Sequence, residues 1–433
     1  MEQDSGRIAC RHGRLRHNLT MTSICIYLQV HQPYRVKRYS LFDIGNDHAY
    51  FNESGGNDLN NRRILRKVDD KSYRPTAELL MRLLNRHPEF KVALSFSGIV
   101  LEQLERDAPE TLALFQEMVR TGRVEILGET HYHSLAFFYS RPEFEKQVEK
   151  HRTFVSRLFG ATPRIFRNTE LSYRNDLGTW ADEHGYAGII TEGWDRVLGW
   201  RSPNYIYRPR GASSTRLLLK NYRFSDDVAF RFSSRDWSEW PLTTEKFGQW
   251  VSATPGDTIN LFMDYETFGE HQWAESGIFE FMRALPGAAL RRGVRFLTPG
   301  EAAANLVPSG AVELPQPLSW ADRERDVSAW AGNAIQQDAL RRVYDLAPVI
   351  RALPTGAAGA RIREDWRRLQ SSDHFYYMAT KQWSDGEVHK YFSPYDSPYA
   401  AHVRWMNVMD DLEHRCARLR GTARADRAAH PAP

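Results

Sequence analysis

Hydrophobic and polar positions define two kinds of segment that alternate along the chain. Short apolar runs rich in β-branched residues are separated by longer stretches with helical spacing, which predicts a parallel sheet covered by helices. Several of the runs are apolar on both faces, as expected for strands buried between helices and a core. The predicted strands are residues 24–30, 91–97, 123–128, 164–169, 187–191, 259–264 and 294–298. Helices are predicted at residues 76–87, 101–120, 142–159, 176–185 and 276–285.

The same pattern divides the chain into successive parts. Seven strands in one β/α series predict that residues 21–305 form an α/β catalytic domain, a distorted seven-stranded (β/α)7 barrel. Within it, residues 205–220 are expected to form a hairpin in an inserted segment. A proline-containing linker is predicted at 306–318, and helical spacing resumes in 319–416. This last part is expected to be a C-terminal α-helical bundle domain that completes the cleft.

The two ends of the chain differ in composition from its body. Residues 1–20 are basic and contain no apolar run, and residues 417–433 are rich in alanine, arginine and proline, so both are expected to be disordered, and Met21 is a candidate start. The formal net charge of +4 is concentrated in the termini, which leaves the body close to neutral. A near-neutral body argues against nucleic acid as a partner.

Composition narrows the class of protein further. No run of about eighteen apolar residues occurs, so no membrane-spanning segment is predicted. Three cysteines (Cys10, Cys25 and Cys416) are too few for a disulfide framework, which favours the reducing cytoplasm. The chain also contains 12 Trp, 19 Tyr and 22 Phe, more than a core of this size needs. The excess is typical of a surface that stacks on sugars or bases.

Carboxylates are concentrated where the predicted strands end. In a β/α barrel these C-terminal ends meet at one mouth, where the chemistry takes place. Four of the seven ends carry one: Glu129, Glu170, Glu192 and Asp264. Cleavage of an acetal needs one carboxylic acid and one carboxylate on opposite sides of the sugar, and Glu170 with Asp264 would supply the pair. The alternative, that either residue caps a helix or forms a structural ion pair, stays open at this point.

The neighbours of these residues support the catalytic interpretation. Glu266 and His271 lie close to Asp264 among aromatic residues, a concentration of polar groups that a simple turn does not need. Arg167 and Arg174 flank Glu170 and could hold its carboxylate ionised.

Two further polar segments allow more than one interpretation. His31 and Gln32 follow the first strand and could bond sugar hydroxyls, although a polar turn explains them equally well. The segment from Glu125 to His133 carries histidines at 131 and 133. Their spacing is not the helical i, i+4 arrangement of a metal site, and no third ligand follows, so neither metal nor cofactor is expected.

The motifs FRNTELSYRN, MDYETFGEH, VHQPYR and GRVEIL together resemble glycoside hydrolase family 57, specifically its α-amylase-type members. The similarity continues through SWADRERDVSAWAGN and SSDHFYYMATK and covers nearly all of residues 21–410. It implies a seven-stranded barrel, a helical bundle and retaining cleavage of α-glucosidic bonds. It places the nucleophile on Glu170 and the general acid/base on Asp264. Thr169 departs from the pattern, because many members have proline before the nucleophile.

The resemblance also suggests residues that contact sugar. These are His31, Glu125, Glu266, Asp326 and Trp330. The polar segments add Gln32, Glu129, His131 and His271 as substrate-binding candidates.

The expected substrate is an α-1,4-glucan such as starch, glycogen or a maltooligosaccharide, with no membrane partner and the oligomeric state left open. The same site would act as a 4-α-glucanotransferase or a branching enzyme if a sugar replaced water as acceptor. One alternative is a metal-dependent polysaccharide deacetylase or mannosidase on a related barrel, although HQP lacks the adjacent aspartate pair that a deacetylase would show. Another is an inactive glucan-binding protein.

Overall fold

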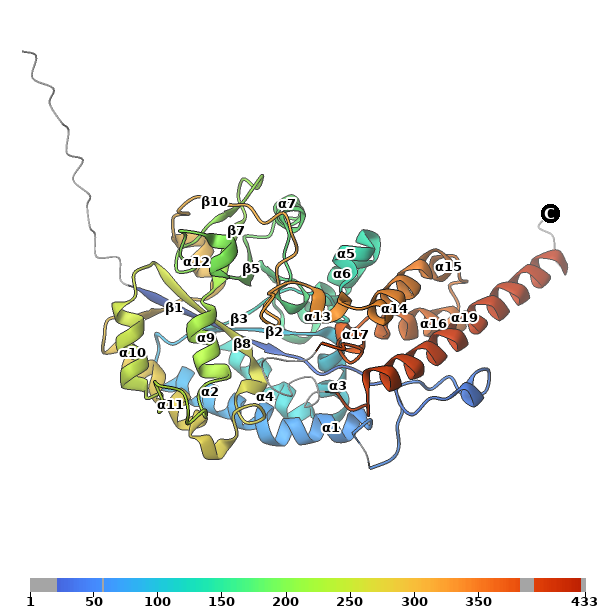
Figure 1. Ribbon diagram of the computed structural model, residues 1–433, viewed down its shortest axis with the longest axis horizontal. Helices are drawn as coiled ribbons and strands as arrows, with labels where there is room; N and C mark the ends of the chain where they lie inside the picture. Colours follow the sequence, from blue (N-terminus) through green and yellow to red (C-terminus); the bar gives the residue numbers. More distant parts are fainter. Residues whose placement is uncertain (1–21, 57, 382–392, 430–433) are drawn as a thin grey trace, which may run out of the picture.

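The computed structural model describes residues 22–56, 58–381 and 393–429, so the predicted N-terminal extension lies outside the described residues (Figure 1). Parallel strands form the barrel, and helices cover them. The barrel strands are β1 (Ser23–Val30), β2 (Val92–Phe96), β3 (Val124–Ile126), β4 (Ile165–Arg167), β5 (Gly188–Glu192), β7 (Arg216–Lys220) and β8 (Thr258–Asp264).

The ring of strands is closed but distorted. One sheet has the order β3-β2-β1-β8 and a second has the order β4-β5-β7. A single bridge between Gly128 and Phe166 joins β3 to β4. At the other junction the Asn221 amide donates to the Asn260 carbonyl at 2.9 Å. The Asn260 side chain donates to the Leu219 carbonyl at 2.8 Å, so hydrogen bonds replace ladder pairing between β7 and β8.

The prediction of seven barrel strands included one wrong segment. Residues 294–298 contain only the short strand β9 (Arg295–Phe296), which pairs with the first two residues of β1. The seventh place belongs to β7, inside the segment that we expected to form a hairpin. The strand is buried on both faces, because Leu218 belongs to the interior cluster, whereas Leu217 and Leu219 belong to the apolar cluster shared with the C-terminal helices. An antiparallel bridge from Tyr207 to Leu217 is the remnant of that hairpin.

Helices cover the outside of the barrel. They are α1 (Asn61–Val68), α2 (Arg74–Arg86), α3 (Gly98–Asp107), α4 (Pro109–Arg120), α5 (Ala136–Tyr139), α6 (Arg141–Phe159), α7 (Asn175–Glu183), α8 (Asp195–Leu198), α9 (Tyr222–Ala229), α10 (Thr244–Ala253), α11 (Ile278–Leu290) and α12 (Pro299–Asn305). Short helical turns are η1 (Leu41–Asp43), η2 (Asp69–Tyr73), η3 (Thr169–Leu171), η4 (Tyr265–Thr267) and η5 (Ala274–Ser276). Polar caps start several helices: the Ser97 hydroxyl, for example, accepts from the Val100 amide at the start of α3.

Strand side chains alternate between the barrel interior and the surrounding helices, as the period of two requires. On β1, Ile24 and Ile26 belong to the cluster under the helices, whereas Cys25 and Tyr27 belong to the interior cluster. The ring of Tyr27 meets Phe262 of β8 edge-on inside the barrel, with centroids 5.5 Å apart. The barrel is therefore a packed core and not a pore.

The C-terminal helices lie together on one side of the barrel (Figure 1). They are α13 (Ser328–Ala331), α14 (Ala334–Asp345), α15 (Ala347–Arg351), α16 (Ala357–Arg368), α17 (Ser372–Tyr376) and α19 (Pro398–Ala429). Trp330, Trp366 and Trp405 are buried there in the same apolar cluster as Phe166 and Ile189 of the barrel. Because the core is shared, the helical region and the barrel pack as one body.

The connection to these helices runs along the barrel. Within 306–318, the strand β10 (Ala311–Val312) pairs with β6 (Arg208–Pro209). Tyr173 and Leu318 exchange backbone hydrogen bonds of 2.8 and 2.9 Å.

The predicted disorder of the tail is wrong for residues 417–429, which continue the helix α19. Alanine and arginine are among the strongest helix formers, and here they extend a helix whose first half is packed. Residues 430–433 lie outside the described part.

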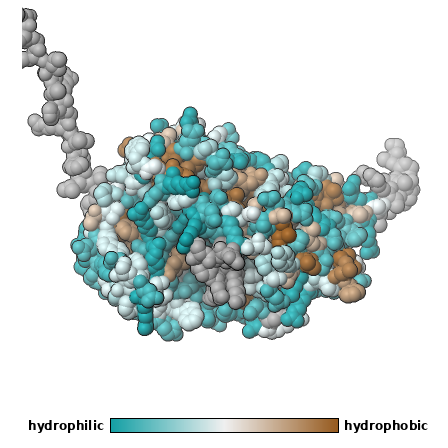
Figure 2. All heavy atoms as spheres, in the orientation of Figure 1, coloured by the Kyte–Doolittle hydropathy of each residue, from teal (hydrophilic) through white to brown (hydrophobic). Residues whose placement is uncertain are grey.

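The face shown in Figure 2 is largely hydrophilic, and its hydrophobic residues lie in separate patches. Among the described residues, no helix is both long and apolar enough to cross a bilayer.

Candidate active site

A ring of polar side chains lies inside the barrel, above its apolar interior. Along each strand, the residue two positions after a buried interior residue also faces the interior of the barrel. These polar residues are Gln29, Ser95, Glu129, Arg167, Glu192, Lys220 and Asp264. The period of two therefore brings residues from all seven strands to one end of the barrel.

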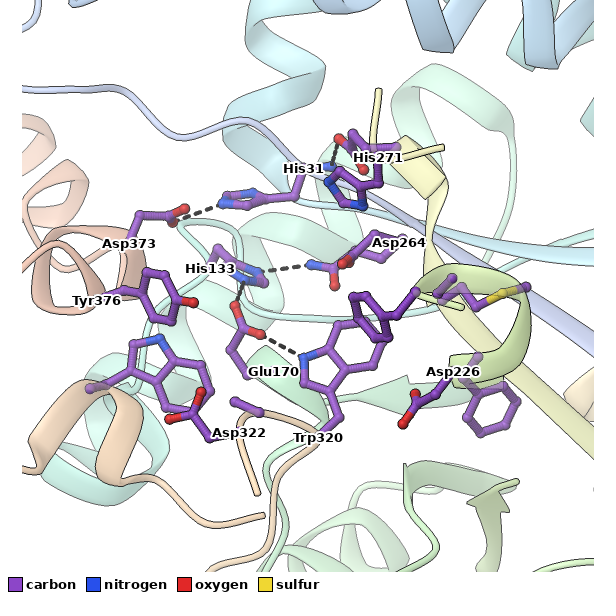
Figure 3. A pocket seen from close by; sticks show the side chains of 18 of the residues that line it. His31, His133, Glu170, Asp226, Asp264, His271, Trp320, Asp322, Asp373 and Tyr376 are labelled. Atoms are coloured by element: carbon purple, nitrogen blue, oxygen red, sulfur yellow. Dashed lines mark hydrogen bonds and ion pairs between the residues drawn. The ribbon is translucent and has the colours of Figure 1, made fainter. Parts of the chain in front are cut away.

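A cavity of about 620 Å³ opens at this end. Glu170 and Asp264 both line it (Figure 3). Of the predicted substrate-binding residues, the cavity is lined by His31, Gln32, Glu266, His271 and Trp330. The helical region and the loop before it contribute Trp320, Asp322, Arg325, Asp373, Tyr376 and Tyr377.

Glu170 follows β4 in a strained turn. Its φ of 60° and that of Leu171, 52°, lie in the left-handed region that non-glycine residues rarely adopt. The Thr169 hydroxyl donates to the Ser134 carbonyl at 2.7 Å, a bond that the proline of many family members cannot make. Although Thr169 departs from the family pattern, Glu170 lines the cavity (Figure 3).

Two donors hold the Glu170 carboxylate. His133 Nε2 lies 2.9 Å from Oε1, and Trp320 Nε1 donates to Oε2 at 2.7 Å. Burial raises the pKa of Glu170, but the hydrogen bond and charge of His133, with the charge of Arg167, outweigh it and hold the pKa below its usual value. Glu170 is therefore ionised at neutral pH.

His133 lies between two carboxylates. Its Nε2 faces Glu170, and its Nδ1 lies 3.4 Å from Glu129 Oε2. Burial lowers the pKa of His133, whereas these two bonds raise it, and the result is about 9. Glu129 is itself buried and paired with Arg167 at 3.2 Å. A protonated imidazole thus connects Glu129, a member of the polar ring, to Glu170.

Asp264 has the opposite protonation preference. Burial and the charge of Glu170 raise its pKa to about 6, although Arg167, Lys220 and His133 act against the rise. The two carboxyl groups of this cavity thus differ in protonation: Glu170 is ionised, whereas Asp264 is able to keep a proton.

Glu266 lies deeper, beside η2. Its carboxyl group is hydrogen-bonded to the Tyr73 hydroxyl, and the His31 amide donates to it at 3.4 Å. Burial and the charge of Asp264 raise the pKa of Glu266 to about 8. A neutral carboxyl group at this position can donate as well as accept hydrogen bonds.

His31 connects the first strand to the helical region. Its Nε2 lies 2.9 Å from Asp373 Oδ2 and its Nδ1 lies 2.7 Å from Ser97 Oγ. The ring stacks on His133 with centroids 3.9 Å apart. Burial and the charge of His133 lower the pKa of His31, so a neutral ring packs on a charged one.

Four of the predicted substrate-binding residues do not line the cavity. Glu125 accepts from the Gly300 amide at 2.7 Å, at the barrel base where α12 begins. Glu129 is enclosed beneath His133, where it pairs with Arg167. His131 points outward to Glu102, with its Nε2 3.0 Å from Oε1. Asp326 accepts from the Ser328 amide at 2.8 Å.

His133, Trp320 and Asp373 are among the cavity-lining residues that the sequence analysis did not predict. His133 lies two positions after His131, which was the predicted substrate-binding residue. The φ of 54° at His133 turns its side chain away from that of His131. Trp320 lies in the segment SWADRERDVSAWAGN and Asp373 in SSDHFYYMATK. The similarity of these two segments to the family is the feature of the sequence that could have indicated both residues. Across the described ranges, no group of three or more His, Cys, Asp or Glu side chains could hold a metal ion.

A β/α barrel with two carboxyl groups of divergent protonation in one cavity is the architecture of a glycoside hydrolase. The family model named Glycosyl hydrolase family 57 matches residues 25–315. A Methanocaldococcus jannaschii protein described as "Putative alpha-amylase" is 38% identical over 412 residues, which cover 93% of this chain and 87% of the relative. The chain belongs to glycosyl hydrolase family 57 and is a glycoside hydrolase.

Solved structures support the fold. A branching enzyme of Pyrococcus horikoshii matches with a TM-score of 0.64 at 14% identity, covering 92% of this chain and 94% of that one. A 4-alpha-glucanotransferase of Thermococcus litoralis matches with a TM-score of 0.62 at 16% identity, covering 91% of this chain and 60% of that one.

Proposed function

We propose that the protein cleaves α-1,4-glucosidic bonds with retention of configuration, as an α-amylase does. The observation that carries the proposal is the divergence of two carboxyl groups in one cavity. Glu170 is held ionised by His133 and Trp320, whereas burial and the charge of Glu170 favour the protonated form of Asp264. Retaining cleavage needs an ionised nucleophile and a protonated acid at the same time.

In the first step, Asp264 gives its proton to the glycosidic oxygen while a carboxylate oxygen of Glu170 attacks the anomeric carbon. The bond to the leaving sugar breaks, and a β-glucosyl ester of Glu170 forms. In the second step, the Asp264 carboxylate takes a proton from water, whose oxygen displaces Glu170. The product has the α configuration, and both carboxyl groups return to their starting states.

Substrate contacts follow from the cavity lining. His31, Gln32, Glu266, His271 and Trp330 are proposed to contact the sugar, because they line the same cavity as the reacting pair. Phe230, at the end of α9, also lines the cavity, yet its side chain is 58% exposed. An exposed aromatic ring at the rim offers a flat apolar face, which supports an extended glucan as the substrate.

The same site would act as a 4-α-glucanotransferase or branching enzyme if a sugar hydroxyl took the place of water. Relatives bearing all three names are similar to this chain. Starch, glycogen and maltodextrins are the proposed glucans. A cytoplasmic location is proposed from the few cysteines; Cys25 and Cys416 are both free and buried.

The deciding experiment follows the products from maltoheptaose and the anomer that forms first. Hydrolysis yields shorter maltooligosaccharides, transfer yields longer ones, and branching yields α-1,6 linkages. Release of a β anomer would contradict retention. Binding of maltoheptaose without turnover would favour the inactive glucan-binding protein.

Two variants separate the roles of the carboxyl groups. Glu170→Gln should lose retaining turnover, and azide that takes the place of the missing nucleophile on an α-glycosyl fluoride should give a β-glycosyl azide. Asp264→Gly should still react with an activated α-glycosyl fluoride, and azide, like water, should then displace Glu170 with inversion and release an α-glycosyl azide. Formation of the α-azide by the Glu170 variant, with the β-azide from the Asp264 variant, would reverse the assignment.

A further inference from the structure

The loop from Leu318 to Val327 enters the site from outside the barrel. Its Trp320 indole donates to Glu170 Oε2 at 2.7 Å, and the Trp320 amide donates to the Glu170 carbonyl at 3.3 Å. Figure 3 shows the indole beside the carboxylate, with the bond between them dashed. One of the two donors to this carboxylate therefore comes from a loop that lies outside the barrel strands.

Two cations of the barrel flank the indole. The Arg167 guanidinium and the Lys220 ammonium each lie 5.4 Å from the Trp320 ring. Both lie within cation–π range, which favours the ring position found here. These contacts orient the ring, but they do not fix the backbone from which it extends.

Arg325 holds that backbone. Its Nη1 donates to the Trp320 carbonyl at 2.7 Å and to Glu192 Oε2 at 2.9 Å. Its Nη2 donates to Asp226 Oδ2 at 2.9 Å. Glu192 is the last residue of β5 and Asp226 lies on α9, so one side chain ties the loop to two barrel elements.

The connection is buried and charge-balanced. The Arg325 side chain is 13% exposed, and Lys220 adds a second cation 3.0 Å from Asp226 and 3.7 Å from Glu192. Arg325 itself has a φ of 51°, and Asp322 has one of 54°. Such left-handed residues persist only where surrounding contacts hold them. A guanidinium can serve three acceptors in fixed directions, which a lysine ammonium on a flexible stem does not reproduce.

We propose that Arg325 is a positioning residue: it fixes the loop so that Trp320 delivers its N–H to Glu170. The inference rests on the proposed role of Glu170 in glucan cleavage. Arg325 acts through Trp320 and not on the sugar, so its loss should lower kcat more than it changes KM.

The test compares Arg325→Gln, Trp320→Phe and the double variant on maltoheptaose. Each single variant should lose about 10-fold to 100-fold in kcat, the effect of one hydrogen bond to a charged group. Because both changes remove the same bond, the double variant should be no slower than Trp320→Phe. Losses that multiply would overturn the proposal, as would a wild-type kcat in Arg325→Gln.

Two further variants guard against a merely structural effect. Arg325→Lys keeps the charge and should show an intermediate kcat, which also serves if Arg325→Gln does not fold. Arg342 bonds Asp410 and Glu413 outside the cavity, so Arg342→Gln should keep the wild-type kcat.

If the wild-type protein cleaves no α-glucan, the proposed function fails but Arg325 remains testable. A crystal structure of Arg325→Gln should then show Trp320 Nε1 beyond hydrogen-bond distance of Glu170. An unchanged Trp320 would refute the positioning role.

Discussion

Replacing His133 by asparagine should move the whole pH profile of kcat/KM to higher pH. Protonated His133 favours the ionised form of Glu170 through a 2.9 Å bond, and its charge also lowers the pKa of Asp264. Removing it disfavours both carboxylates. The acid limb, which reports Glu170, and the alkaline limb, which reports Asp264, should therefore shift in the same direction. Asparagine suits the site because it tolerates the left-handed φ of 54°.

The two limbs should shift by different amounts. A hydrogen bond to a charged group contributes roughly 1.5–3 kcal/mol, and one pKa unit corresponds to about 1.4 kcal/mol. The acid limb should therefore rise by roughly one to two pH units. The alkaline limb should rise less, because His133 is the weakest of the cited influences on Asp264 and acts on it through charge alone.

The assay is the initial rate on maltoheptaose between about pH 3 and pH 9, with thermal melts at each pH to exclude unfolding. His131→Asn is the matched control, because His131 lies two residues away but bonds Glu102 outside the cavity. Its profile should match that of the wild type. An acid limb that stays in place in His133→Asn would refute the electrostatic account of Glu170.

Three more outcomes are expected. In the wild type, kcat/KM should fall tenfold per pH unit above about pH 6, because Asp264 loses the proton that it must donate; a flat profile to pH 8 would contradict this assignment. Phe230→Ala should raise KM for long glucans several-fold and leave a short activated glycoside unaffected, whereas Trp200→Ala, at a residue 88% exposed outside the cavity lining, should change neither. Gly98→Ala should lower Tm, because its Cβ would lie 2.0 Å from His131 Nδ1, a contact that backbone or ring must move to relieve; an unchanged melting curve would show that the ring moves freely.

Much of this protein follows from patterns that are local in sequence. Apolar runs located six of the seven barrel strands, since a strand buried on both faces needs apolar residues throughout. Glu170 and Asp264 could be found because each lies at the C-terminal end of such a run, and the ends of parallel strands share one mouth. The period of two would also have identified the polar ring, as it places Arg167 two residues beyond the interior Ile165.

The tertiary structure determines which residues contact one another in the site. Local spacing cannot separate His131 from His133, since the left-handed turn at His133 depends on packing around it. Trp320 and Asp373 reach the site from segments that lie 150 residues beyond Glu170 and 342 residues beyond His31. Which side chains complete the cavity thus depends on how the helical region packs on the barrel, through buried contacts between residues far apart in the chain. Such contacts leave no periodic pattern in the sequence, because each depends on the shape of the partner it meets.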